Sequence, residues 1–297
     1  MIRRIFGNLY FLTFLNGFLL ATLFYFRMEG SNEQQLFNAI QSDIDGKIDK
    51  NGSKDSLIVK IMHECNALLY ERASVFGDQS LGGFKADVIR PTSVDLMTAR
   101  GACGSYSIVL ARLLKNYGYP VRIAQMKAKG VFALHNVVEA KTTSGWVVLD
   151  PLFNVYFKKP DGLSLASFDD VSKNWAYYSQ QLPSNYDHSY RYEDVRYTNW
   201  DKIPVIFPAF RKILSLFIGK EADTFSMRVH FLKMYDWYFY GTLIIYLPIL
   251  LITLRKLIKT KIFPQPNIPL TLANLVHYVR MRFANKGTHS ELQPEQI

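Results

Sequence analysis

The chain has 297 residues, with 35 Lys and Arg against 25 Asp and Glu, a formal net charge of +10 and two cysteines. This length suits one domain of ordinary size with flanking segments. Two cysteines exclude a disulfide-stapled scaffold, and a bridge between Cys65 and Cys103 would need an oxidising compartment. Residues 28–235 hold 25 basic against 22 acidic side chains, so most of the positive excess lies in the flanks. A cytoplasmic membrane surface attracts charge placed there, and we therefore expect no nucleic-acid partner.

The first element is an uncharged run at residues 5–26, which predicts a transmembrane helix. A helix of this length, at about 1.5 Å per residue, crosses a hydrocarbon core of roughly 30 Å. A cleavable secretory signal is the alternative, because Arg3 and Arg4 precede the run. The run is too long for such a signal and bulky residues follow where a cleavage site would need small ones. We therefore expect it to remain as an anchor.

The segment after this anchor is polar at first and then helical. Residues 31–56 are rich in Asp, Asn, Lys and Ser and predict a surface helix or linker outside the core. Residues 55–73 carry apolar side chains at three- and four-residue steps, which predicts a helix with Cys65 buried in it. Residues 77–91 contain two adjacent glycines and predict a loop.

A helix followed by three strands occupies the centre of the chain. Gly101 precedes a helix predicted over residues 102–117. Three β-patterned runs follow, at residues 121–126, 132–140 and 146–149. The five-residue loop between the last two runs fits a hairpin. This order predicts an α+β fold in which helices pack on one face of an antiparallel sheet.

The last part of the chain returns to the membrane. Residues 155–200 have no regular period and predict irregular surface. Residues 208–218 predict a short amphipathic helix, either on the membrane surface or buried in the core. Residues 237–254 are uncharged, with aromatic residues at one end and basic residues beyond the other, and predict a second transmembrane helix that Pro248 kinks rather than ends. Residues 270–285 predict a cytoplasmic helix lying on the bilayer, and the last ten residues of the chain are expected to be disordered.

Basic residues beyond both predicted spans place the two chain ends on the same side of the membrane. The predicted organisation is a cytoplasmic N-terminus at 1–4, a span at 5–26, an extracytoplasmic domain at 28–235 with its core at 55–155, a span at 237–254 and a cytoplasmic basic tail at 255–297. A bacterial inner membrane is the natural location, with its lipid as one partner.

Cys103, His135 and Asp150 form a candidate catalytic triad. Cys103 lies in the opening turn of the central helix, where the helix dipole lowers the pKa of a thiol and free N–H groups point at a developing oxyanion. If the five-residue loop closes the hairpin, His135 stands opposite Asp150 within one residue, with Cβ atoms about 5 Å apart. Asp150 then accepts the imidazole N–H and fixes its tautomer. His135 and Glu139 lie about 13 Å apart along a strand, so we expect no metal there.

Three blocks around these residues resemble the signature of the transglutaminase-like superfamily. They are RGACGSYS at residues 100–107, HNVVE at 135–139 and GWVVLDPLFN at 145–154. Their order and spacing are similar to the family pattern over about residues 55–155. The resemblance implies a papain-like fold and a triad in which Cys103 attacks an amide carbonyl, His135 moves the proton, and water or an amine resolves an acyl-thioester. Asn136 departs from the commoner pattern, and no side-chain oxyanion donor is evident upstream of Cys103.

Two functions are compatible with these patterns. The leading hypothesis is a thiol acyltransferase or hydrolase that acts on amide bonds of a peptide or protein and is held at the membrane by two helices. The alternative is an inactive module with the same fold, which binds a partner in a cell-envelope assembly or a polysaccharide export system. The intact triad favours the enzyme, for which we expect no cofactor.

Overall fold

The chain forms two units, one made of helices near its ends and one α+β unit between them. The computed structural model describes residues 8–47, 54–76, 81, 83 and 85–261. Residues 25–239 form one unit, and residues 1–24 with 240–297 belong to the other. The arginines at positions 3 and 4, much of the predicted 77–91 loop and the predicted tail helix at 270–285 lie outside the described residues.

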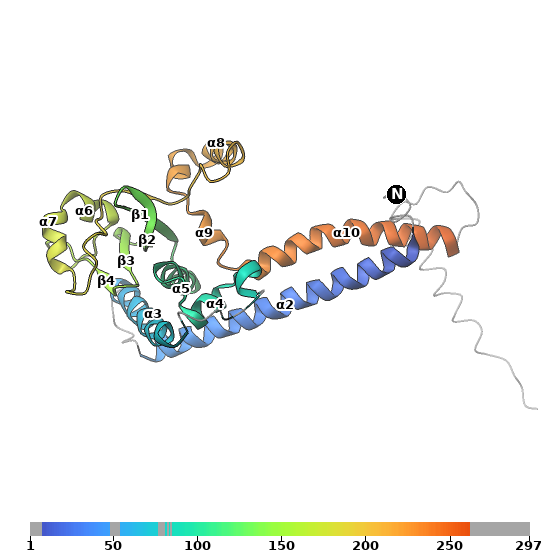
Figure 1. The fold of residues 1–297 in the computed structure, drawn as a ribbon, viewed down its shortest axis with the longest axis horizontal. Coiled ribbons are helices and arrows are strands. Elements are labelled where there is room, and N and C mark those ends of the chain that lie inside the picture. Colours follow the sequence, from blue (N-terminus) through green and yellow to red (C-terminus); the bar gives the residue numbers. More distant parts are fainter. Residues whose placement is uncertain (1–7, 48–53, 77–80, 82, 84, 262–297) are drawn as a thin grey trace, which may run out of the picture. The chain divides into compact units, whose positions relative to one another are not determined.

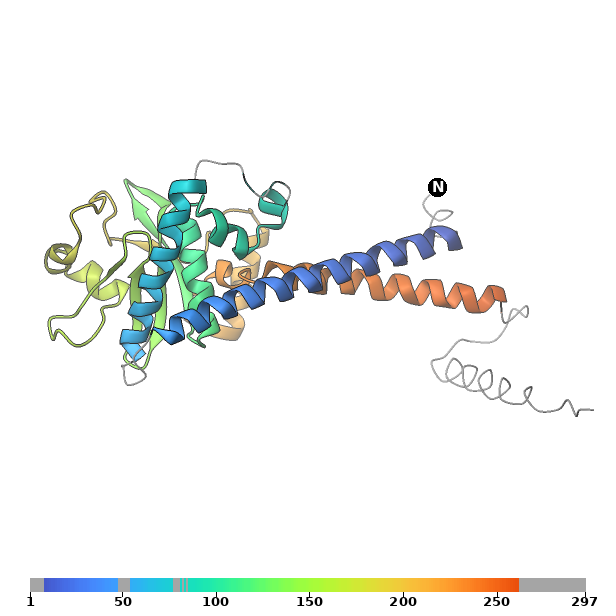
Figure 2. The same ribbon diagram turned by 90° about the horizontal axis from the view of Figure 1, so that it is seen from below.

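Two helices, α2 (Leu9–Gly46) and α10 (Met234–Lys261), are long and apolar enough to cross a membrane by length and composition. In the unit of the chain ends they run side by side, as Figures 1 and 2 show. The Asn16 side-chain amide donates a hydrogen bond of 2.7 Å to Thr253 Oγ1 between them, and such polar contacts link helices in lipid. Pro248 lies inside α10 without ending it.

The part of α2 beyond residue 24 belongs to the α+β unit and contributes to its core. Phe37 and Ile44 are fully buried, so the prediction that residues 31–56 lie outside the core is wrong for these two positions. Their side chains join the apolar cluster of the next helix, α3 (Lys54–Phe76), in which Cys65 is buried as predicted. The prediction was based on the polar composition of this segment, which did not indicate that two of its apolar residues are buried.

The sheet has five antiparallel strands. They are β1 (Val121–Ala128), β2 (Val131–Thr142), β3 (Gly145–Asp150), β4 (Val155–Tyr156) and β5 (Val195–Arg196). Their order across the sheet is β4-β3-β2-β1-β5. The first three strands contain the predicted runs and extend one or two residues beyond them. The runs are strands because alternating and β-branched apolar residues favour extended structure. The predicted antiparallel α+β class is confirmed.

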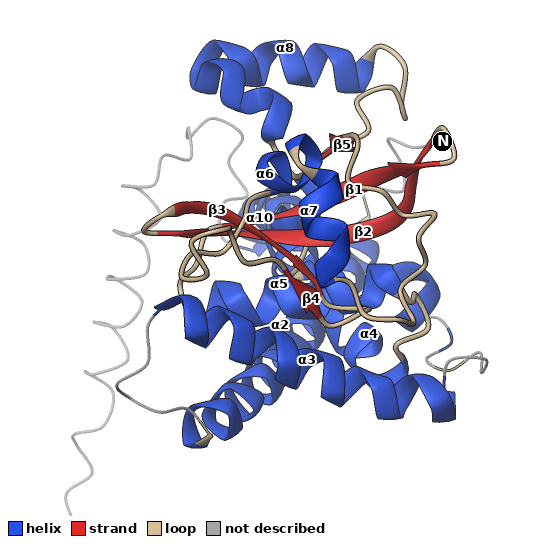
Figure 3. Ribbon diagram, turned by 90° about the vertical axis from the view of Figure 1, so that its left-hand side faces the viewer, coloured by secondary structure: helices blue, strands red, loops and turns tan. Residues whose placement is uncertain are grey.

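Both faces of this sheet are covered, as Figure 3 shows. On one face lie α3, α4 (Thr92–Thr98) and α5 (Cys103–Asn116), which pack against inward side chains such as Val138 and Leu149. On the other lie α6 (Phe168–Lys173), α7 (Trp175–Tyr178) and the segment around them, packed on Val137 and Val148. Successive residues of β2 are therefore buried on opposite faces. The sequence predicted helices on one face alone.

Short helices complete the α+β unit. They are the π-helical turn η1 (Lys85–Ile89), the 3₁₀ turns η2 (Ser179–Gln181) and η3 (Gly219–Thr224), α8 (Ile206–Ile218) and α9 (Met227–His230). None of the thirteen residues of α8 is buried, so the alternative that placed this segment in the core is wrong. In Figure 1, α8 lies apart from the sheet.

Candidate active site

The loop before α5 is tied down by hydrogen bonds that run through Ser105. The Ser105 hydroxyl accepts a 2.9 Å hydrogen bond from the Gly101 N–H and donates one of 2.6 Å to Asp95. A Cβ at Gly101 would lie 2.7 Å from Ser105 Oγ and 3.2 Å from its backbone nitrogen, so only glycine fits this close approach. Ala102 follows with a φ of 43° and a ψ of −122°, a conformation that glycine favours and alanine adopts under strain.

This turn presents Cys103 as the first residue of α5, with its side chain partly exposed. Its sulfur lies 3.8 Å from the Leu134 carbonyl oxygen and 3.4 Å from the Asn136 side-chain nitrogen. Within the described ranges, the Cys103 N–H meets no hydrogen-bond acceptor. It therefore stands free at the positive end of the helix, where an anion is stabilised.

His135 and Asp150 form a buried pair that interacts with this thiol. Nε2 of the imidazole lies 2.6 Å from Oδ2 of the carboxylate, and both residues are buried. The His135 ring stacks on Tyr190 at 4.6 Å between centroids with an interplanar angle of 10°, and Phe153 tilts against it at 5.6 Å. Carboxylate and aromatic rings together fix the orientation of the imidazole.

The second imidazole nitrogen, Nδ1, is not bound by Asp150 and is therefore available to the thiol. His135 Nδ1 is buried and makes no hydrogen bond to any atom of the described chain. Burial alone would raise the pKa of Cys103, but the nearby imidazole of His135 and the hydrogen bond from Asn136 outweigh burial and lower that pKa. Burial would also lower the pKa of His135, but the charge and hydrogen bond of Asp150, with the interaction of Cys103, raise it to about 9. Both shifts favour a thiolate–imidazolium pair near neutral pH.

The hairpin reaches this geometry with a different register from the predicted one. The strands extend to Thr142 and Gly145, which leaves a two-residue turn, and Val138 pairs with Leu149. Continuing this ladder by one step sets Asp150 across from Val137, two residues from His135. The prediction that His135 and Asp150 face each other within one residue is therefore wrong. They meet diagonally, because residues two apart share a face of the sheet.

The turn chemistry explains the shift. Thr142 Oγ1 accepts a hydrogen bond of 3.1 Å from the Ser144 N–H, and Gly145 adopts a φ of 120° that a side chain would oppose. These local contacts close a tighter hairpin than a five-residue loop would form. On the other side of β2 the ladder with β1 skips Ala133 and Leu134, and this bulge directly precedes His135.

Two residues that the sequence did not assign to the site contact this group. The Asn136 amide donates to the Cys103 sulfur, and its side-chain oxygen accepts a 3.1 Å hydrogen bond from Arg228 Nη1. The guanidinium therefore orients the amide with its N–H groups toward the sulfur. The only indication for Asn136 was its departure from the family pattern. Arg228 lies 92 residues further along the chain and stood in no motif.

The second cysteine has a different environment. Cys65 is fully buried, and burial raises the pKa of its thiol well above the ordinary value. Both cysteines are free thiols in the structure. In the described part of the chain, no three His, Cys, Asp or Glu side chains are grouped so as to hold a metal ion. Cys103 is therefore the thiol with the features of a nucleophile.

Comparison of the chain with models of protein families, with curated proteins and with solved structures finds no match. The contacts of the site bring Cys103, His135 and Asp150 into one group, and the catalytic role of this group stays a prediction.

Proposed function

We propose that this protein is a membrane-anchored thiol enzyme with a papain-like core, similar to the transglutaminase-like superfamily, that cleaves or exchanges amide bonds of a peptide or protein. One observation carries the proposal: a thiol with a lowered pKa at a helix start interacts with an imidazole that a buried carboxylate holds at 2.6 Å. Nucleophilic catalysis by cysteine needs these three features together.

The first half of the reaction acylates the enzyme. The Cys103 thiolate attacks the amide carbonyl carbon, and the electrons of the carbonyl double bond move onto its oxygen. The free Cys103 N–H and the Asn136 amide, whose nitrogen lies 3.4 Å from the sulfur, are the donors that we expect to stabilise this oxyanion. The carbon–nitrogen bond then breaks, and protonated His135 gives its Nδ1 proton to the leaving amine. The product is an acyl-thioester on Cys103.

The second half releases the acyl group. Water or an acceptor amine attacks the thioester carbonyl while neutral His135 takes the proton of the nucleophile at Nδ1. The carbon–sulfur bond breaks, which regenerates the thiolate and the imidazolium. Asp150 keeps its hydrogen bond to His135 Nε2 and stabilises the imidazolium that forms. A peptidase, an amidase and a cross-linking transferase differ only in this acceptor.

The proposed setting is the outer side of a bacterial inner membrane. Two apolar helices support the anchor, and the basic residues beyond the second span support the orientation. A peptide or protein of the cell envelope is then the substrate class that reaches the thiol.

Alkylation kinetics of the full-length chain test the proposal. We expect iodoacetamide at pH 7 to modify Cys65→Ala rapidly at one site, and Cys103→Ala to lose that modification. Unfolding Cys65→Ala in urea should slow the reaction, because the thiol pKa returns to its ordinary value. Equal rates for folded and unfolded protein would contradict an activated thiolate and favour the inactive module.

Trapping the intermediate identifies the acyl donor. Candidate envelope peptides are incubated with the full-length chain, the reaction is quenched in acid, and the intact mass is measured. We expect an adduct that hydroxylamine removes and that Cys103→Ala does not form. His135→Gln is the matched control, since it keeps the thiol but lacks the base.

A further inference from the structure

Helix α8 exposes a broad apolar surface. Ile206, Ile213 and Phe217 recur at steps of seven and four residues and therefore share one side of the helix. Leu216 lies beside them. The exposed fractions are 64% for Ile206, 54% for Ile213, 79% for Leu216 and 82% for Phe217. An apolar surface of this kind on a folded protein marks a contact with another apolar phase or partner.

The rest of the α+β unit holds the helix by a different side. Phe207 and Leu214, seven residues apart, are the two half-buried positions of α8. Arg211 donates to Asp223 of η3 through Nε at 3.0 Å and Nη2 at 2.5 Å. These contacts fix the rotation of α8 about its axis, and the apolar side is therefore exposed.

The covalent chain keeps α8 close to a membrane if α10 spans it. Residues 219–236, a stretch of 18, join the end of α8 to the apolar run that starts at residue 237. Even fully extended, this stretch reaches roughly 60 Å, and it is shortened here by η3 and α9. If α10 spans the membrane, the bilayer therefore stays close enough for α8 to contact it.

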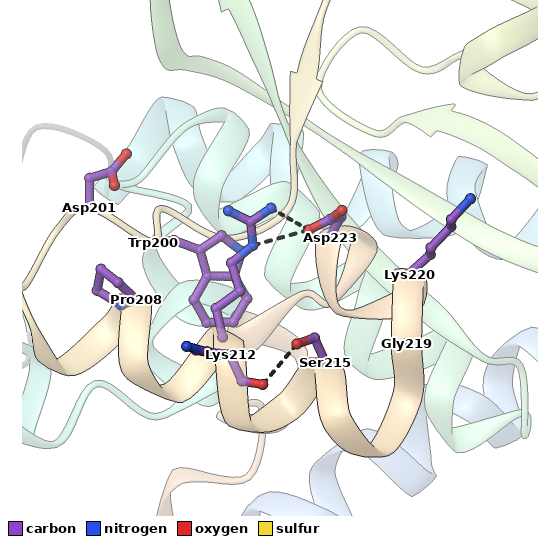
Figure 4. Close-up of a pocket in the computed structure, with 9 residues that line it drawn as sticks. Trp200, Asp201, Pro208, Lys212, Ser215, Gly219, Lys220 and Asp223 are labelled. Carbon is purple, nitrogen blue, oxygen red and sulfur yellow. Dashed lines mark hydrogen bonds and ion pairs between the residues drawn. The ribbon is translucent and has the colours of Figure 1, made fainter.

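Polar groups on the flank of α8 suit the headgroup region. Lys212 and Lys220 line an open cavity with Trp200 between α8 and η3, and neither lysine pairs with a carboxylate of the described residues. Figure 4 shows Lys212 and Ser215 along the helix below Trp200, and Lys220 extending away from that ring. Lysines beside an apolar face place their ammonium groups at lipid phosphates while the stems stay in the apolar layer.

We propose that α8 is an interfacial helix that lies in the plane of the bilayer, with Ile206, Ile213, Leu216 and Phe217 inserted among the lipid chains. The proposal depends on α10 as a span and is independent of the thiol chemistry. If α8 lies in the bilayer surface, the α+β unit has a membrane contact in addition to the transmembrane helices.

Nitroxide labels on the full-length chain in nanodiscs test this placement. Single cysteines replace Ile213, Leu216 or Phe217 in a Cys65→Ala, Cys103→Ser background. Collision with oxygen, which concentrates in lipid, is compared with collision with a water-soluble nickel chelate. We expect the three labels to favour oxygen several-fold. Labels at Ser215 and Leu163 are the controls; Leu163 is an apolar loop residue with 89% exposure, and both should favour nickel.

A second measurement uses the native chain, in case the cysteine background is unstable. Lipids that carry a photoactivated diazirine in the acyl chain are cross-linked and the adducts are mapped by mass spectrometry. We expect adducts in residues 205–218 and none in residues 161–164. Labels that favour nickel as strongly as position 163, with no adducts in α8, would overturn the proposal. Spin–spin broadening between α8 labels that disappears on dilution with unlabelled chain would also overturn it, because a second copy would then cover the helix.

Discussion

Replacing Asn136 by leucine tests whether its amide stabilises the Cys103 thiolate. Leucine keeps the branched shape and the number of heavy atoms of the side chain and removes the N–H group, whose nitrogen lies 3.4 Å from the sulfur. A hydrogen bond to a charged group contributes about 1.5–3 kcal/mol, and this long contact to sulfur belongs at the lower end. At about 1.4 kcal/mol per pKa unit, the loss of about 1.5 kcal/mol raises the thiol pKa by about one unit.

The assay is the pH dependence of Cys103 alkylation in the Cys65→Ala background. We expect the titration of Asn136→Leu to shift upward by about one unit and alkylation below the new pKa to slow by about tenfold. Ser107→Ala is the matched control. Its hydroxyl donates a 3.0 Å hydrogen bond to the backbone oxygen of Asn136 and does not touch the sulfur, so its titration should stay in place.

Turnover separates thiolate stabilisation from oxyanion stabilisation. If the Asn136 amide also binds the oxyanion, kcat falls by about 10²–10³, well beyond the change in alkylation. Arg228→Met should move the titration in the same direction, because the guanidinium both orients the amide and attracts the thiolate by its charge. The effect of Arg228→Met that remains in the Asn136→Leu background measures the direct attraction. An unchanged thiol titration in Asn136→Leu would refute the hydrogen bond as a source of the low pKa.

Three further predictions concern pH, the α5 loop and topology. The raised pKa of His135 means that its ion pair stabilises the fold fully below the ordinary value of 6.5 and is lost as pH rises through about 9; the difference in unfolding free energy between wild type and His135→Gln should follow that course, and a constant difference would contradict it. Gly101→Ala should lower the free energy of unfolding by about 1–3 kcal/mol because of overpacking. Gly104→Ala, whose Cβ meets nothing within 4 Å, should raise the free energy of unfolding by about 0.5–1 kcal/mol. Urea unfolding that ranks the two variants in the opposite order would contradict the loop geometry. Single cysteines at residues 160 and 290 should react with an impermeant maleimide from opposite sides of the membrane, and labelling from the same side would contradict two spans.

The apolar pattern of the sequence was sufficient for the main elements. α3, α5 and the first three strands lie where the periods of 3.6 and 2 put them, because each period is a property of the local backbone and each buried face needs apolar residues. The position of Cys103 at the first residue of α5 was also local, since Gly101 and the apolar stripe after it mark the helix start.

Other features depended on contacts between distant segments. The hairpin register was set by a Thr142 hydroxyl and a Gly145 conformation, and a shift of two residues still left His135 and Asp150 on one face. Phe37 is buried because other helices, with Arg112 of α5 over its ring, pack against a helix whose composition looked solvent-exposed.

The sequence by itself determined the two apolar helices, the α+β order and the three residues proposed for chemistry, because these are written in short periodic runs and motifs. Only the tertiary structure decided that Asn136 and Arg228 join the thiol and that α8 turns its apolar side outward. The physical reason is that these contacts join residues far apart in the sequence, which meet only when the chain folds. A local sequence period does not specify which arginine lies near the thiol or which side of α8 is exposed.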